Sequence, residues 1–130
     1  LTGKKEILKN ALRVRKIFGG GMRQVGYLAA AGIYALNNNI ERLAEDHNRA
    51  KKIGAVLENC SYVKKVEPIE TNIVIFYVND TIDPMEFIKK LESKGILLIS
   101  MGEGKIRIVT HLDFTDEMCD KLLGELRGID

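Results

Sequence analysis

The segment from Met22 to Leu36 is apolar on every side of the helix that it would form, and it constrains the fold more than any other feature. A helix that covers a core needs one apolar stripe, whereas a helix that is apolar all round is buried on every side. Its continuous apolar part, Val25 to Leu36, is well short of the roughly 20 residues that span a bilayer. We therefore expect no membrane segment here, and we expect this helix to pack against a larger domain or another subunit.

Three glycines, Gly19 to Gly21, separate this segment from an amphipathic helix predicted for residues 4–17. Consecutive glycines disfavour a helix because they lose the most backbone entropy on folding. Cations gather beside them, since residues 1–23 carry seven Lys and Arg against one Glu, a net charge of +6, and the rest of the chain carries −4. Backbone N–H groups at a helix start, together with Lys16 and Arg23, are suited to bind phosphate or carboxylate. The alternative is that the glycines only connect two helices.

The pattern of the remaining residues predicts a two-layer α/β sandwich. Residues 40–57 predict a long amphipathic helix in which Glu45 and Arg49 form an i,i+4 pair on the outer face. After it the apolar period shortens to that of strands, and Asp83 and Thr115 are each positioned to cap a further helix. The expected strands are 62–66, 72–78, 96–99 and 105–110, so that the order from residue 61 is β-β-α-β-β-α.

The cysteines and histidines predict no metal site. Cys60 and Cys119 lie far apart without the spacing of a zinc site or a disulfide framework, so we expect buried or half-buried thiols in a reducing, cytoplasmic compartment. His47 falls on the inner face of the long helix, where a structural histidine is expected. Asp46 and His47 are adjacent helical residues that point apart, so they do not form part of a triad.

Two motifs carry a family resemblance. The stretch "RKIFGGGMRQ" near the start and "IRIVTHLD" near the end, with the sequence around them, resemble the C-terminal part of low-specificity L-threonine aldolases. The resemblance extends over essentially all 130 residues. These aldolases are pyridoxal-phosphate enzymes of fold type I, the aspartate-aminotransferase type, and cleave L-threonine or L-allo-threonine to glycine and acetaldehyde.

The resemblance implies roles for particular residues. Arg107 matches the arginine that holds the α-carboxylate of the substrate, and as a planar bidentate donor it suits that role. Because side chains alternate along a strand, Arg107 is expected on the face opposite Ile106 and Ile108. His111 follows it and is a candidate to support it. The positions matching the surroundings of the cofactor phosphate are Lys16, Gly20, Gly21 and Arg23.

The resemblance also implies that the catalytic machinery is incomplete here. In the family, the lysine that holds the cofactor covalently lies upstream of the matched segment, so this chain is expected to contain no catalytic residue and to be inactive alone. Its expected partners are the amino-acid substrate and either a missing N-terminal half or neighbouring subunits of a homo-oligomer. Residues 1–36 would be the tail of the large cofactor domain and residues 37–130 the small C-terminal domain.

Two other interpretations remain open at this point. One is a non-catalytic α/β module that binds RNA, although Phe76 and Tyr77 are adjacent and so face opposite sides of a strand, unlike paired RNA-stacking aromatics. No nucleic-acid partner is therefore expected. The other is a split enzyme, in which a separate polypeptide supplies the lysine.

Overall fold

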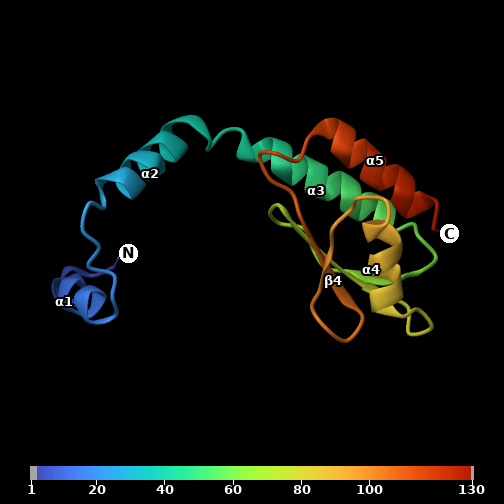
Figure 1. Cartoon of the computed structure of the whole chain (residues 1–130), viewed down its shortest axis with the longest axis horizontal. Helices are drawn as coiled ribbons and strands as arrows, with labels where there is room; N and C mark the ends of the chain where they lie inside the picture. The colour runs from blue at the N-terminus through green and yellow to red at the C-terminus, as the bar shows by residue number, and fades with distance from the viewer. Residues whose placement is uncertain (1–2, 130) are drawn as a thin grey trace. The chain divides into compact units, whose positions relative to one another are not determined.

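The computed structural model describes residues 3–129, and these form two compact units, the first ending at Ile40 and the second beginning at Glu41 (Figure 1). The first unit contains helices α1 (Lys5–Ile17) and α2 (Gly26–Asn38). Neither helix contains a buried residue. The large apolar side chains of α2 are 60% or more exposed, so the first unit does not itself supply the partner that the composition of this helix requires. The division into domains after residue 36 stays a prediction about a longer protein.

The start of α2 differs from the sequence-based expectation. The helix was predicted from Met22 but begins at Gly26, because Gln24 adopts a left-handed backbone conformation with φ of 52°. A residue in that region cannot continue a right-handed helix. Arg23 therefore lies in the turn before α2 rather than in its first turn, and the prediction for Arg23 was wrong on this point.

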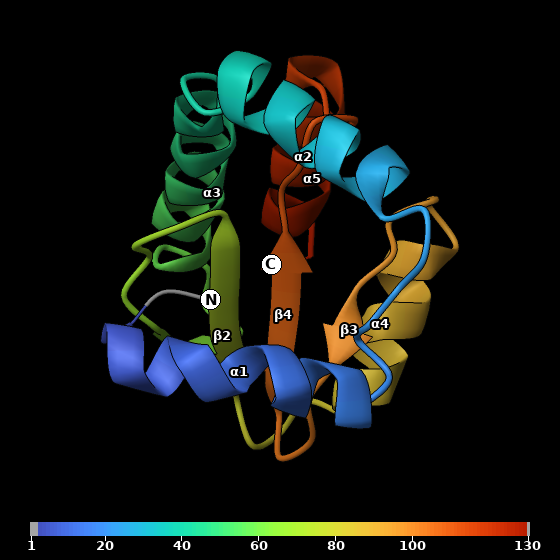
Figure 2. The same ribbon diagram turned by 90° about the vertical axis from the view of Figure 1, so that its left-hand side faces the viewer.

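The second unit is built on a four-stranded antiparallel sheet in the order β1-β2-β4-β3. Figure 2 shows β4 between β2 and β3. The strands and the three helices of this unit follow the predicted order, which confirms the mixed α/β architecture. The elements are α3 (Leu43–Leu57), β1 (Val63–Val66), β2 (Ile73–Val78), α4 (Pro84–Glu92), β3 (Ile99–Ser100), β4 (Lys105–Val109) and α5 (Asp116–Arg127).

Alternation along β2 and β4 gives the sheet one buried face. Phe76 pairs with Ile106 and Val74 with Ile108, and all four side chains are buried against the helices. In Figure 1, α5 lies alongside α3. The opposite face of the sheet is open within this unit, and it carries the residues of odd number on β2 and β4.

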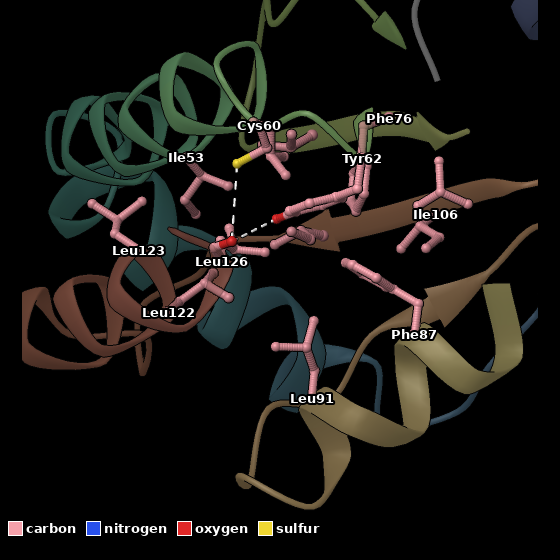
Figure 3. Packing of buried hydrophobic residues seen from close by; sticks show 14 of the residues in the cluster. Ile53, Cys60, Tyr62, Phe76, Phe87, Leu91, Ile106, Leu122, Leu123 and Leu126 are labelled. Carbon is pink, nitrogen blue, oxygen red and sulfur yellow. Dashed lines mark hydrogen bonds between the residues drawn. The ribbon is translucent and has the colours of Figure 1, made fainter. Parts of the chain in front are cut away.

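The core lies between the three helices and the sheet, and a buried hydrogen bond links Tyr62 to α5 within it. The hydroxyl of Tyr62 donates to the carbonyl of Leu126 at 2.9 Å, and the thiol of Cys60 lies 3.9 Å from the same oxygen (Figure 3). Both cysteines are free and buried, as predicted. Burial raises the pKa of the Cys119 thiol.

The buried face of α3 is formed by Asp46, Ala50, Ile53, Gly54 and Leu57. His47, which was expected on the inner face, is half-buried. The helix begins at Leu43 rather than at residue 40. The caps of the other two helices were predicted correctly. Asp83 accepts from the backbone N–H groups of Met85 and Glu86, and Thr115 accepts from that of Met118.

Candidate functional site

Arg107 lies on the open face of the sheet, in the central strand β4. Its neighbours along the strand, Ile106 and Ile108, are buried on the other face, as predicted. Across the sheet Arg107 pairs with Ile75 of β2 and Ile99 of β3. Neither of these side chains can accept a hydrogen bond, so the guanidinium group stands between two apolar residues.

The Nε atom of Arg107 is buried and, among the residues that the structure describes, has no hydrogen-bond partner. A buried donor left without an acceptor costs about 1–3 kcal/mol, and such groups are rare in folded proteins. Arg107 forms no salt bridge with any described residue either. A carboxylate from outside this chain would satisfy both the charge and the N–H group, because guanidinium and carboxylate pair in a bidentate geometry.

Further cations share the open face with Arg107. Lys105 lies two residues before it on β4, and the ammonium groups of Lys105 and Lys65 each lie 5.8 Å from the ring centre of Tyr77. Lys65 is hydrogen-bonded to Glu67, which lowers the pKa of that carboxyl and raises the pKa of the lysine. Arg107, Lys105 and Lys65 therefore bring positive charge to this face, and positive charge favours an anionic ligand.

His111 does not support Arg107 through a hydrogen bond. Its Nδ1 accepts from the backbone N–H of Asp113 at 3.3 Å, and its carbonyl accepts from the N–H of Phe114 at 2.9 Å. These bonds shape the turn that follows β4. With Nδ1 as acceptor, the imidazole presents Nε2 as its remaining polar atom, and the side chain is 60% exposed.

Thr110, between Arg107 and His111, was not identified from the sequence. It is fully buried, and its hydroxyl donates to the main-chain carbonyl of Asp46 in α3 at 2.8 Å. Its backbone pairs with Asn72, whose carbonyl accepts from the Thr110 N–H at 3.0 Å and whose side-chain amide donates to the Thr110 carbonyl at 2.6 Å. The end of β4 is thus held from two sides. Asp46 and Thr110 are 64 residues apart, so no local pattern could have revealed the contact.

Asp46 is itself the centre of an ion-pair network. Its buried carboxylate receives two hydrogen bonds of 3.0 Å from Arg42, and Arg49 lies 3.4 Å away. Arg49 also donates to Asp116 at 2.8 Å, at the first turn of α5. The predicted pair of Glu45 with Arg49 exists at 3.8 Å, but Arg49 is only 11% exposed and its shorter contact is with Asp116. This network fixes α5 to α3.

The glycines of the first unit follow the end of α1, as predicted, but they do not lie at the start of α2. Gly19 has φ of 79°, the N–H of Gly20 donates to the Arg15 carbonyl at 2.7 Å, and that of Gly19 donates to the Lys16 carbonyl at 3.2 Å. This pair of bonds is the Schellman motif that ends helices. A Cβ atom at Gly20 would lie 2.8 Å from Cγ of Arg15, and one at Gly21 would lie 3.3 Å from Cγ of Lys16. Close packing therefore adds a second reason for glycine here.

The turn that follows keeps part of the expected anion site. Gly21 packs against the stem of Lys16, so these two candidates lie together. The backbone N–H groups of residues 21–25 have no partner in the described part of the chain. Lys16 and Arg23 likewise have no acidic partner there. Unpaired N–H groups beside two cations suit an anion, but the N–H of Gly20, predicted to be available, is committed to Arg15.

Neither a metal cluster nor a membrane helix is present among residues 3–129. No three His, Cys, Asp or Glu side chains gather there as metal ligands do. No described helix combines the length and the apolar character needed to cross a membrane.

Comparison with known proteins places this arrangement in a class. A solved structure of C-DES, a lysine-to-alanine mutant with glycine covalently linked to its PLP cofactor, shares the fold with a TM-score of 0.61 over 78% of this chain and 28% of its own length. The two are 21% identical, so the likeness concerns the fold. A model of the beta-eliminating lyase family matches residues 1–81, and the chain belongs to this family.

The most informative relatives are threonine aldolases. A probable low-specificity L-threonine aldolase of Arabidopsis thaliana is 37% identical over 121 residues, which is 89% of this chain and 34% of the relative. The low-specificity L-threonine aldolase of Escherichia coli K12 is 35% identical over 128 residues, 98% of this chain and 37% of the relative. The similarity that the motifs indicated is thereby confirmed. The chain spans about a third of the length of these relatives.

Proposed function

We propose that this chain is the C-terminal portion of a pyridoxal-phosphate-dependent aldolase that cleaves L-threonine or L-allo-threonine to glycine and acetaldehyde. The observation that carries the proposal is the buried, unpaired Nε of Arg107 on the open face of the sheet. An amino-acid substrate supplies the carboxylate that this guanidinium lacks. Its apolar neighbours Ile75 and Ile99 would strengthen that ion pair by excluding water from it.

The first unit has the kinds of groups that bind a phosphate such as that of the cofactor. The unpaired N–H groups of residues 21–25, with Lys16 and Arg23, offer donors and positive charge to a phosphate group. When bound, pyridoxal phosphate supplies an electron sink for breaking the bond between the α and β carbons. Gly20 and Gly21 would allow the chain to approach the phosphate closely, and His111 would contribute only through the turn that it shapes.

Activity would require residues beyond these 130. The lysine that holds the cofactor is expected in the part of the relatives that this chain does not span, so we propose that the chain is inactive by itself. The exposed apolar side chains of α2 support a large partner, either the rest of the same enzyme or a neighbouring subunit of a homo-oligomer. The two buried, unpaired thiols are consistent with a cytoplasmic protein.

The test is substitution of Arg107 in the complete enzyme. Arg107→Ala is expected to raise KM for threonine roughly 10- to 100-fold, because a hydrogen bond to a charged group contributes about 1.5–3 kcal/mol. The content of bound pyridoxal phosphate, measured by absorbance, should not change. Arg107→Lys should recover only part of the affinity, because lysine cannot form the bidentate pair.

The exposed residue Arg127 provides the matched control. Arg127→Ala should leave KM unchanged, which separates a local effect from a general loss of positive charge. An unchanged KM in Arg107→Ala would contradict the proposed function.

A further inference from the structure

We propose that Thr110 is a positioning residue, whose hydroxyl fixes the end of β4 to α3 and thereby presents the Arg107 guanidinium to its ligand. The proposal rests on the proposed function of Arg107. Asp46 and Thr110 are both buried, and the hydroxyl of Thr110 donates to the main-chain carbonyl of Asp46. A buried hydroxyl thus lies three residues beyond Arg107, the residue proposed to bind the carboxylate.

Arg107 has no polar partner among the described residues that would fix its side chain. Its Nε has no hydrogen-bond partner, and its cross-strand neighbours are isoleucines. The base of this side chain follows its backbone, so the placement of the guanidinium depends in part on where β4 runs. The ladders to β2 and β3 and the anchor at Thr110 set the course of β4.

The anchor at Thr110 is one half of a double clamp on α3. The segment 110–116 leaves β4 and enters α5, and both of its ends are bonded to α3. Thr110 donates to the Asp46 carbonyl at one end, and Arg49 donates to Asp116 at the other. Arg42 and Arg49 both hold the Asp46 side chain, so the helix turn that receives Thr110 is fixed in turn.

The hydroxyl of Thr110, not the size of the side chain, forms the anchor. Valine has nearly the same shape as threonine and favours strands equally, so a purely apolar core position would accept it. With valine, the Asp46 carbonyl loses its second donor and the strand end loses its tie to α3. Serine keeps the hydroxyl and gives up only a methyl group.

The experiment compares Thr110→Val with Thr110→Ser, and Val78→Ala serves as a control for stability. Val78 is buried at the other end of β2, beside Gly104, so its truncation weakens the same core away from Thr110. The first readout is the NMR signal of the Arg107 Nε–H in this 130-residue chain. We expect Thr110→Val to shift or broaden it, and Thr110→Ser and Val78→Ala to leave it at the original position.

The second readout is steady-state kinetics of the complete enzyme. Thr110→Val should raise KM for threonine about tenfold, since a small misplacement of a binding group has large effects, with kcat and cofactor content little changed. Thr110→Ser should restore KM. If Thr110→Val does not fold, Asp116→Ala, which removes the acceptor of Arg49 at the exposed end of the clamp, takes its place with the same expectation in both readouts.

The outcomes separate the two proposals. An Arg107 signal that is unchanged in Thr110→Val, or that moves equally in Val78→Ala, overturns the positioning role, because the effect would then be absent or merely structural. The second case is a shifted Arg107 signal in Thr110→Val while KM is unchanged in both Thr110→Val and Arg107→Ala. This result upholds the clamp and overturns the proposed function of Arg107.

Discussion

The side chain of Arg107 differs from the other buried polar groups of the second unit in its hydrogen bonding. Asp46 has two arginines, Thr110 has a main-chain carbonyl, and Tyr62 donates to Leu126. The Nε of Arg107 has no such partner among the described residues. Since a fold that pairs its other buried groups leaves this one open, the natural explanation is a ligand.

The contact between Tyr62 and Leu126 gives a prediction at the same scale. Tyr62→Phe should lower the free energy of unfolding in urea by about 1 kcal/mol, because it removes a buried hydrogen bond while keeping the ring. Tyr27, which is 84% exposed against 5% for Tyr62, provides the control. If Tyr27→Phe and Tyr62→Phe shift the urea midpoint equally, the buried bond contributes nothing specific.

Single residues were predicted well where the signal is local. Alternation along β4 placed Arg107 correctly, and the sequence around Asp83 and Thr115 identified two helix caps. The anchor at Thr110 could not be predicted, because its partner is 64 residues away and a threonine in a strand is ordinary.

At the scale of elements, the contact of α3 with α5 depends on charge as well as on packing. Arg49 of α3 hydrogen-bonds Asp116 of α5, which lowers the pKa of the Asp116 carboxyl. A carboxyl whose pKa is lower in the folded state stabilises the fold at any pH above its unfolded-state value, about 3.9 for aspartate. That contribution is lost as the pH falls through the folded-state pKa.

This linkage predicts the pH dependence of one variant. Asp116→Asn should be less stable than the parent at pH 7, and the difference should shrink as the pH falls below the ordinary aspartate range. Urea unfolding at a series of pH values measures it. Asp120→Asn on the same helix, where Asp120 has no salt bridge to a described residue, should show no such trend. A difference for Asp116→Asn that stays constant with pH would contradict the linkage.

The order of elements was predictable from the sequence, but several boundaries were not. The strand expected at 96–99 is reduced to Ile99–Ser100, and α2 begins four residues later than its apolar pattern suggested. The start of α2 is delayed because the backbone of Gln24 is left-handed, which the apolar pattern does not reveal. The end of the first helix at the glycine run was predicted correctly, but the glycines were also expected at the start of α2, which begins only at Gly26.

At the scale of the whole molecule, the two units differ in whether they bury their apolar side chains. The second unit buries its apolar side chains in one core, whereas α1 and α2 bury none. Exposed apolar surface of this extent marks a contact with another protein part. The length of the relatives, of which this chain spans about a third, offers such a part.

The measurement that tests this account most directly is the intact mass and absorbance spectrum of the gene product, purified under native conditions from its own cell. The account predicts that residues 1–130 occur within a polypeptide about three times as long, or in a tight complex with a second polypeptide, and that pyridoxal phosphate is bound. A free chain of this length that stays monomeric and takes up no added pyridoxal phosphate, alone or with candidate partner subunits, would contradict it.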